Sequence, residues 1–220
     1  MFDTIILLTG RVEQATMALL LWDHNPSLRI VSIGSADDLA NLNTDILPRA
    51  RLIAFVTSVI VPQRILGRLG YGAFNFHPGP PRYPGWAPSH FALYEQATEF
   101  GATVHVMVEQ VDAGPIIDVA PFRVPAGISV FGLERMTYAR LAQLFRRMSR
   151  RLASDPEPPP VLPVRWGSRT YSRRAFGQLC DIPGDLPKDE FEHRMRIFGG
   201  KRLEFALRSS CTTHNPDLVS

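Results

Sequence analysis

The sequence predicts an α/β protein with a doubly wound, mostly parallel sheet and a short C-terminal extension. Short apolar runs that suit buried strands recur before residue 80, and segments rich in helix-forming residues alternate with them. Hydrophobic residues make up 45% and charged residues 20% of the 220 positions, as in ordinary globular proteins. Strands that alternate with helices favour a mostly parallel sheet with right-handed crossovers.

The first half of the chain supplies four of the expected strands. We place them at residues 2–8, 28–33, 52–56 and 73–77, because each is a short apolar run bounded by turn formers or helix starts. The helices expected between them are residues 12–22, 36–42 and 62–69, the last beginning at a proline, which suits a first helical turn.

The second half continues the pattern. We expect Ser89 to cap a helix that runs through Gln96, followed by strands at residues 103–108 and 116–122 on either side of a turn at 112–115. A long amphipathic helix comes next, because apolar residues recur at helical spacing with arginines largely on the other face. That apolar stripe consists of Leu133, Leu141, Leu144, Phe145, Met148 and Leu152.

Proline content divides the chain. Residues 155–163 contain five prolines, so we expect a linker between a catalytic domain at 1–154 and a small extension at 164–220, with one helix at 188–198. No apolar run approaches the roughly 20 residues that span a bilayer, and the N-terminus lacks the pattern of a signal peptide. We therefore expect a cytoplasmic protein with no membrane partner.

Charge and cysteine content say little about partners. The net charge is +3 with a pI of 9.1, and arginine supplies nearly all the positive charge. Guanidinium groups suit phosphate and carboxylate recognition, but without a nucleic-acid-binding motif the charge does not favour such a partner. The sequence has two cysteines and no Cys-x-x-Cys motif, so we expect no metal site.

One short segment carries the residues suited to chemistry. Asn75 and His77 lie two apart on the fourth expected strand, so their side chains share a face at its carboxyl end. In such sheets ligands bind beyond the carboxyl ends of the strands. Asn75 and a protonated His77 would stabilise the oxyanion of an acyl transfer, and Asp112 would accept the proton of an attacking amine. We also expect Asp112 to raise the pKa of His77.

Two motifs resemble those of folate-dependent formyltransferases. The sequence Asn-Phe-His-Pro-Gly at 75–79, continuing through the Gly-Trp-Ala-Pro at 85–88, is similar to the family's active-site strand and loop. The sequence at 101–107 resembles its Gly-x-Thr-x-His strand, and that at 111–117 resembles its Asp-x-Gly turn, which bears the catalytic aspartate. The resemblance covers roughly residues 52–152.

The resemblance implies a Rossmann-like fold, the catalytic residues Asn75, His77 and Asp112, and 10-formyltetrahydrofolate as the formyl donor. It also implies a pterin pocket from two segments, although the first of them equally suits a buried strand-to-helix junction. The residues of these segments are Ser58, Val59, Ile60 and Val61, then Glu109, Gln110 and Val111.

The acceptor is the least determined part of the expectation. The loop is most similar to that of sugar N-formyltransferases, so we expect a nucleotide-linked amino sugar bound by Arg82, Tyr83, Gly85 and Trp86. Glycinamide ribonucleotide or another small amine stays open, although residues 9–13 depart from the phosphate loop of that class. The residues after Pro163 are too few for the β-barrel domain of methionyl-tRNA formyltransferases. Hydrolysis, a non-catalytic binding module and a homodimer also stay open.

Overall fold

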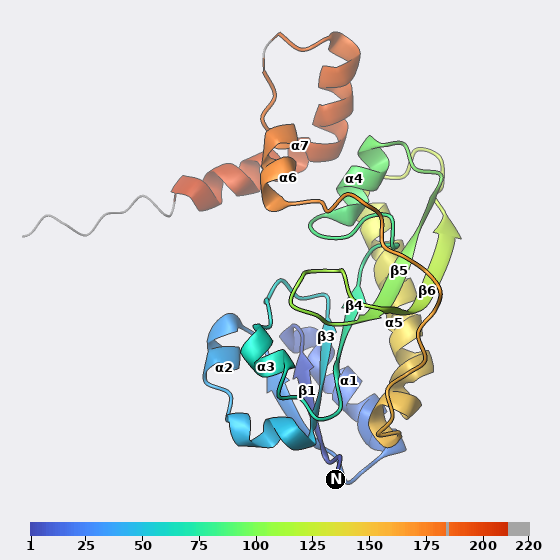
Figure 1. The fold of residues 1–220 in the computed structure, drawn as a ribbon. Helices are drawn as coiled ribbons and strands as arrows, with labels where there is room; N and C mark the ends of the chain where they lie inside the picture. Colours follow the sequence, from blue (N-terminus) through green and yellow to red (C-terminus); the bar gives the residue numbers. More distant parts are fainter. Residues whose placement is uncertain (184, 211–220) are drawn as a thin grey trace, which may run out of the picture.

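The expected α/β fold is confirmed in a computed structural model, which describes the backbone of residues 1–183 and 185–210 and the side chains of 1–183 and 185–199. Within the described residues, a six-stranded sheet has helices on both faces and strand order β2-β1-β3-β4-β5-β6 (Figure 1). The strands are β1 Thr4–Leu8, β2 Arg29–Ile33, β3 Ala50–Phe55, β4 Ala73–His77, β5 Glu99–Val106 and β6 Ile116–Arg123.

The sheet is mixed, with one half parallel and the other antiparallel. The pairs β1–β2, β1–β3 and β3–β4 are parallel, which fits the helices that connect these strands. The pairs β4–β5 and β5–β6 are antiparallel. The carboxyl end of β4 therefore lies beside the start of the antiparallel half, and the loops of both halves meet there.

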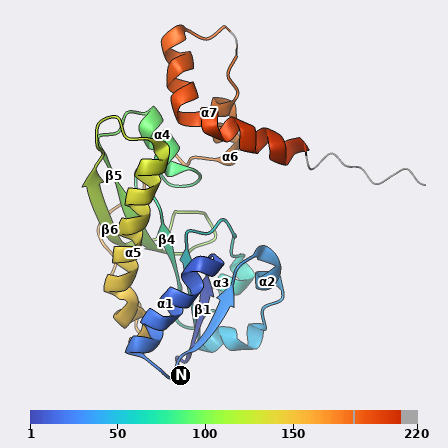
Figure 2. The same cartoon turned by 180° about the vertical axis from the view of Figure 1, so that it is seen from behind.

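Each face of the sheet has its own hydrophobic core. Helices α1 (Arg11–His24) and α5 (Val130–Ser154) cover the face seen in Figure 2. The other face is covered by α2 (Ala36–Ala40), the 3-10 helix η1 (Thr44–Arg49) and α3 (Gln63–Leu66). The apolar stripe expected on the long helix is the buried face of α5, so that prediction is correct.

The predicted cap at Ser89 is wrong. Helix α4 (Pro88–Tyr94) starts one residue earlier, with Pro88 in its first turn and Ala87 as N-cap at a left-handed φ of 51°. The fixed φ of proline suits the first turn, and its missing N–H needs no partner there. Ser89 lies inside that turn and is buried.

The proline-rich segment after α5 is packed against the domain. The Leu162 N–H donates to the Ile116 carbonyl of β6 at 2.7 Å. The guanidinium of Arg51, a fully buried residue of β3, donates to carbonyls at the end of α5 and just beyond it, including Leu152 at 2.6 Å and Asp155 at 2.9 Å. The segment expected as a linker therefore contacts strands of the sheet.

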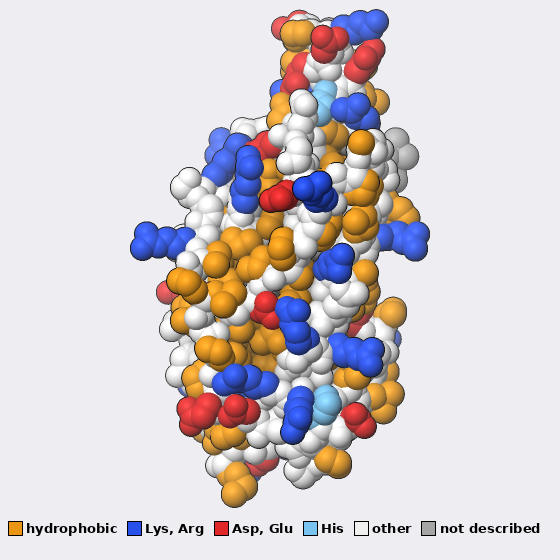
Figure 3. Space-filling view, turned by 90° about the vertical axis from the view of Figure 1, so that its right-hand side faces the viewer, with side chains coloured by type: hydrophobic (Ala, Val, Ile, Leu, Met, Phe, Trp, Pro, Cys, Tyr) orange, Lys and Arg blue, Asp and Glu red, His pale blue; other side chains and the backbone are white. Residues whose placement is uncertain are grey.

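The side of the molecule at β6 carries exposed apolar residues. Hydrophobic side chains lie among scattered basic ones on this side (Figure 3). On the segment beside β6, Val161, Leu162 and Val164 are all exposed. These positions are therefore not part of either core.

The C-terminal helices pack on α4. Helices α6 (Arg173–Cys180) and α7 (Lys188–Ser210) share a third hydrophobic cluster with α4. Helix α7 continues past the expected residues 188–198, and residues 211–220 of the expected extension lie outside the described part. Among the described helices, none is both long and apolar enough to cross a membrane.

Candidate active site

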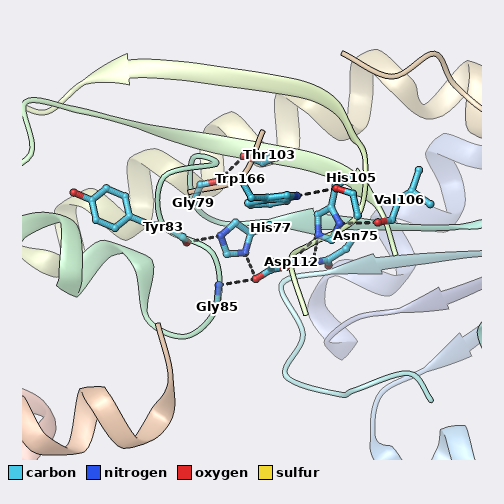
Figure 4. Close-up of polar contacts among 11 residues, drawn as sticks. Asn75, His77, Gly79, Tyr83, Gly85, Thr103, His105, Val106, Asp112 and Trp166 are labelled. Carbon is cyan, nitrogen blue, oxygen red and sulfur yellow. Dashed lines mark hydrogen bonds and ion pairs between the residues drawn. The ribbon is translucent and has the colours of Figure 1, made fainter. Parts of the chain in front are cut away.

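Asn75 and His77 lie at the carboxyl end of β4, as the sequence predicts. Neighbouring β5 is paired so that Asn75 faces His105 and His77 faces Thr103. The period of two on a strand brings the Asn75 and His77 side chains to one face, where His105 joins them (Figure 4). Two histidines and an amide therefore meet on one face of the sheet, near the carboxyl end of β4.

Asp112 is at the centre of these side chains. It lies in the loop between β5 and β6, at a left-handed φ of 45° that is uncommon outside glycine. One carboxylate oxygen, Oδ2, accepts the Gly85 N–H at 2.8 Å and lies 3.2 Å from His77 Nδ1. The other, Oδ1, accepts from Asn75 Nδ2 at 3.2 Å and lies 3.1 Å from His105 Nε2. The structure thus brings the three expected catalytic side chains together.

The surroundings of Asp112 favour its ionised form. Burial alone would raise the pKa of its carboxyl group, but His77, His105 and the Gly85 N–H outweigh burial and lower the pKa to about 2. Charge-assisted hydrogen bonds to a carboxylate are stronger than neutral ones, which fits this direction. Asp112 is therefore a carboxylate at neutral pH.

Burial outweighs the expected effect of Asp112 on the pKa of His77, so the net shift is downward. Burial lowers the pKa of this imidazole, and the Asp112 carboxylate opposes the shift without cancelling it. The ring is 2% exposed, and its Nε2 lies 3.0 Å from the Tyr83 carbonyl oxygen. A neutral imidazole has one N–H and therefore satisfies only one of its two oxygen neighbours at a time.

Gly85 contacts Asp112 through its backbone. Its φ is 100°, and a Cβ atom there would lie 2.1 Å from the Tyr171 carbonyl oxygen, so this position requires glycine. The close approach continues into hydrogen bonds, since Trp86 donates to the Tyr171 carbonyl at 2.7 Å and Tyr171 donates to Pro84 at 2.9 Å. The C-terminal segment therefore holds the loop that holds Asp112.

Two residues of the site were not predicted from the sequence. His105 belongs to the recognised Gly-x-Thr-x-His pattern, which was the available signal, but its contact with Asp112 depends on the antiparallel pairing of β4 and β5. Trp166 donates its indole N–H to the Gly114 carbonyl at 2.7 Å and packs edge-on against both His105 and His77. It lies far along the chain in an irregular segment, so nothing in the sequence pointed to it.

The four residues expected to bind the acceptor occupy different environments. The Tyr83 side chain does not face a ligand as expected, because it is fully buried in the cluster shared with α4. Its carbonyl faces His77. The loop at 78–88 turns this aromatic ring inward, where it packs on Phe100 and Tyr171. Gly85 contributes only backbone.

Of the four residues expected to bind the acceptor, Arg82 and Trp86 have side chains that reach solvent. Arg82 lies 3.7 Å from the Glu95 carboxylate, and most of its side chain is exposed. Trp86 is 39% exposed, and the Arg173 guanidinium lies 4.3 Å from the centre of its ring. Both side chains are therefore accessible to a ligand in this loop.

The segments expected to bind the donor are partly exposed. Val61 is buried in a core cluster, which matches the alternative of a strand-to-helix junction, while Ser58 and Ile60 are exposed and Val59 is half-buried. Glu109, Gln110 and Val111 are exposed on the loop that carries Asp112. A shallow pocket lies between this loop and α3, lined by Gln63, Leu66, Gly67, Met107, Val108 and Glu109.

The fold is of the α/β class, and sequence comparison shows a similarity to formyltransferases. Residues 38–141 match the family model described as formyl transferase. The match covers just under half of the chain, and the α/β fold is consistent with it. The methionyl-tRNA formyltransferase of Listeria innocua is 33% identical over 113 residues, a match that spans 51% of this chain and 34% of that protein.

Solved structures of low sequence identity share the fold. A 4-N formyltransferase from Francisella tularensis has a TM-score of 0.72 at 18% identity, covering 89% of this chain and 87% of that one. An N-formyltransferase from Helicobacter canadensis, in complex with folinic acid and dTDP-3-aminofucose, has a TM-score of 0.66 at 16% identity, covering 90% and 81%. These neighbours extend the likeness over nearly the whole chain.

Proposed function

We propose that this protein transfers a formyl group from 10-formyltetrahydrofolate to the amine of a nucleotide-linked sugar, with Asn75, His77 and Asp112 as the catalytic residues. The observation that carries the proposal is the four-way contact of Asp112 with Asn75, His77, His105 and the Gly85 N–H. A buried carboxylate held this closely, next to amide and imidazole donors, suits proton transfer during attack by an amine.

Asn75 and Asp112 would each have one role in the transfer. The amine nitrogen attacks the formyl carbon, and the Asn75 amide N–H donates to the oxygen that becomes negative. Asp112 accepts the proton that the amine loses. The bond between the formyl carbon and N10 of the folate then breaks, and the proton passes to N10, so tetrahydrofolate leaves and the formamide forms. All atoms and charges balance without a further reactant.

His77 would donate to the same substrate oxygen once that oxygen displaces the Tyr83 carbonyl from the ring. Its two ring nitrogens face Asp112 and the Tyr83 carbonyl in the substrate-free protein. When Nε2 carries the ring proton, it can donate to a substrate oxygen that replaces the Tyr83 carbonyl. Catalytic hydrogen bonds commonly reach their final geometry only when the substrate is bound.

The donor would lie along the loop that carries Asp112. The pocket between α3 and this loop reaches Glu109, and the exposed side chains of Ile60 and Val111 offer apolar surface for a pterin ring. We assign the donor to the two segments Ser58–Val61 and Glu109–Val111 on this basis. The Helicobacter canadensis neighbour, which shares the fold, was solved with folinic acid, a reduced folate.

The acceptor would lie along the proline loop, which consists of residues 78–88. Trp86 presents a half-exposed ring, and Arg82 and Arg173 place two guanidinium groups on the same loop and on the segment paired with it. An aromatic face suits a sugar ring, and arginines suit phosphate oxygens. A nucleotide-linked amino sugar contains both groups, which is why we favour it over a small amine without phosphate.

A panel of acceptors tests the proposal. We expect the protein to release tetrahydrofolate from 10-formyltetrahydrofolate only when a nucleotide-linked amino sugar is present, with the formamide identified by mass spectrometry. Formylation of glycinamide ribonucleotide alone would replace the sugar acceptor. Release with water alone would indicate a hydrolase. No release with any amine or water, together with no thermal stabilisation by reduced folate, would indicate a non-catalytic module.

A further inference from the structure

Trp166 contacts the candidate catalytic cluster from outside the segment that matches the family. Its ring centre lies 5.0 Å from that of His105 and 5.7 Å from that of His77, edge-on in both cases. Its indole N–H donates to the Gly114 carbonyl at 2.7 Å. Gly114 follows Asp112 by two residues, so one side chain contacts both imidazoles and the loop that bears the carboxylate (Figure 4).

The backbone around Trp166 is fixed at several points. Leu162 donates to Ile116 of β6 at 2.7 Å, and Gly167 donates to the Pro81 carbonyl of the proline loop at 2.8 Å. The indole therefore occupies a defined place between β6 and the proline loop. The backbone at Gly167 is packed closely against the same loop, because a Cβ atom there would lie 2.8 Å from the Arg82 carbonyl oxygen.

The side chains of the cluster are unevenly buried. His77, His105 and Asp112 are buried, whereas Asn75 is only partly buried. Asn75 is therefore the most exposed member of the cluster, and Trp166 packs against the two imidazoles. Excluding water strengthens electrostatic interactions inside a site, because the local dielectric falls.

We propose that Trp166 is a positioning residue of this site, holding the Asp112 loop through its indole N–H and keeping water from His77 and His105 with its ring. The inference rests on the proposed function for its kinetic part only. It assigns a role in formyl transfer to the segment beyond the proline-rich stretch, which lies outside residues 38–141.

Two substitutions separate the two roles. Trp166→Phe keeps an aromatic ring and removes the N–H, whereas Trp166→Ala removes both. Trp22 of α1 offers a matched control, because its indole N–H also donates to a backbone carbonyl, that of Leu28 at 2.9 Å. Trp22→Phe and Trp22→Ala should leave the site unchanged. Melting temperatures of all four variants report whether each protein is folded.

The first readout requires no turnover. Diethylpyrocarbonate modifies accessible imidazoles, and peptide mass spectrometry gives the rate at each histidine. We expect Trp166→Ala to raise the rates at His77 and His105 by about five-fold or more, equivalent to about 1 kcal/mol, because the ring no longer covers the two imidazoles. Trp166→Phe should raise them less, and the Trp22 variants should not. Unchanged rates in a folded Trp166→Ala protein would overturn the shielding role.

The second readout is the split between kcat and KM. We expect Trp166→Phe to lower kcat about five-fold with little change in either KM, because the substrates still bind while Asp112 is less well placed. An unchanged kcat would overturn the positioning role. If no amine is formylated by the unaltered protein, the proposed function fails, yet the modification rates still decide whether Trp166 shields the histidines.

Discussion

The backbone N–H of Gly85 donates to the carboxylate of Asp112 at 2.8 Å, which ties the proline loop to the loop between β5 and β6. Both residues have positive φ, 100° at Gly85 and 45° at Asp112. Strained backbone persists where the surroundings hold it, and it is concentrated at functional sites. The arrangement explains why two segments far apart in sequence supply one cluster.

Gly85→Ala should be much more harmful than Gly127→Ala. Both glycines have positive φ, but a Cβ at Gly85 would lie 2.1 Å from the Tyr171 carbonyl, whereas a Cβ at Gly127 would meet nothing within 4 Å. We expect Gly127→Ala to cost about 1 kcal/mol of unfolding free energy and Gly85→Ala several times more, with loss of activity. Urea unfolding measures both costs, and equal values would show that the Gly85 contact is unimportant.

Stability should fall with acidity because of His77. Its pKa in the folded protein lies below the ordinary 6.5, so the unfolded chain binds the proton more tightly. The unfolding free energy of the native protein relative to His77→Gln should be constant above about pH 6.5 and decrease as pH falls below it. Chemical unfolding between pH 5 and 8 measures this difference. A relative gain in stability on acidification would show that the folded pKa is raised.

Arg51→Ala should destabilise the protein far more than Arg49→Ala. Arg51 is buried and donates to several carbonyls at the end of α5, and burial lowers the pKa of its guanidinium to about 10, so it stays charged at neutral pH. Removing it leaves buried carbonyls unpaired, which we expect to cost about 3 kcal/mol or more. Arg49 forms an exposed ion pair with Asp3, worth about 1 kcal/mol or less. Similar costs in thermal unfolding would contradict this account.

Trp86→Ala should weaken acceptor binding and leave donor binding nearly unchanged. Trp86 lies on the proline loop, whereas the pocket assigned to the donor lies between α3 and the loop before Asp112. Aromatic packing on a ring is worth roughly 0.5–1.5 kcal/mol, so KM for the acceptor should rise several-fold. Separate titrations of the two substrates measure this. An equal loss of donor affinity would make Trp86 a general anchor of the site.

The sequence predicted the elements well because hydrophobic periodicity reflects burial directly. The first four strands and α5 follow from such runs, and the pair at Asn75 and His77 shares a face because strand geometry requires it. The sequence predicts the boundaries of an element less well where that element packs against residues far away in the chain. The boundaries of α4 differ because Pro88 rather than Ser89 determines the first turn.

The missing parts of the site are those that depend on tertiary contacts. Tyr83 reads as a loop aromatic suited to a ligand, but the packing of Phe100 and Tyr171 places it in a core. The pKa of His77 was expected to follow its charged neighbour, and its complete burial outweighs that neighbour. Trp166 reaches the cluster only because the proline-rich segment runs back along β6, a path that no local pattern encodes.

The most direct test of the account is the kcat for formyl transfer from 10-formyltetrahydrofolate to a nucleotide-linked amino sugar by Asp112→Asn. Asn keeps the shape of the side chain and cannot accept the amine's proton as a carboxylate does. We expect kcat to fall about 10²-fold or more while the variant stays folded, and Asp118→Asn, which removes the charge that pairs with Arg147 at the surface, to keep normal turnover. A folded Asp112→Asn protein with unchanged kcat would contradict the proposed catalytic role of Asp112.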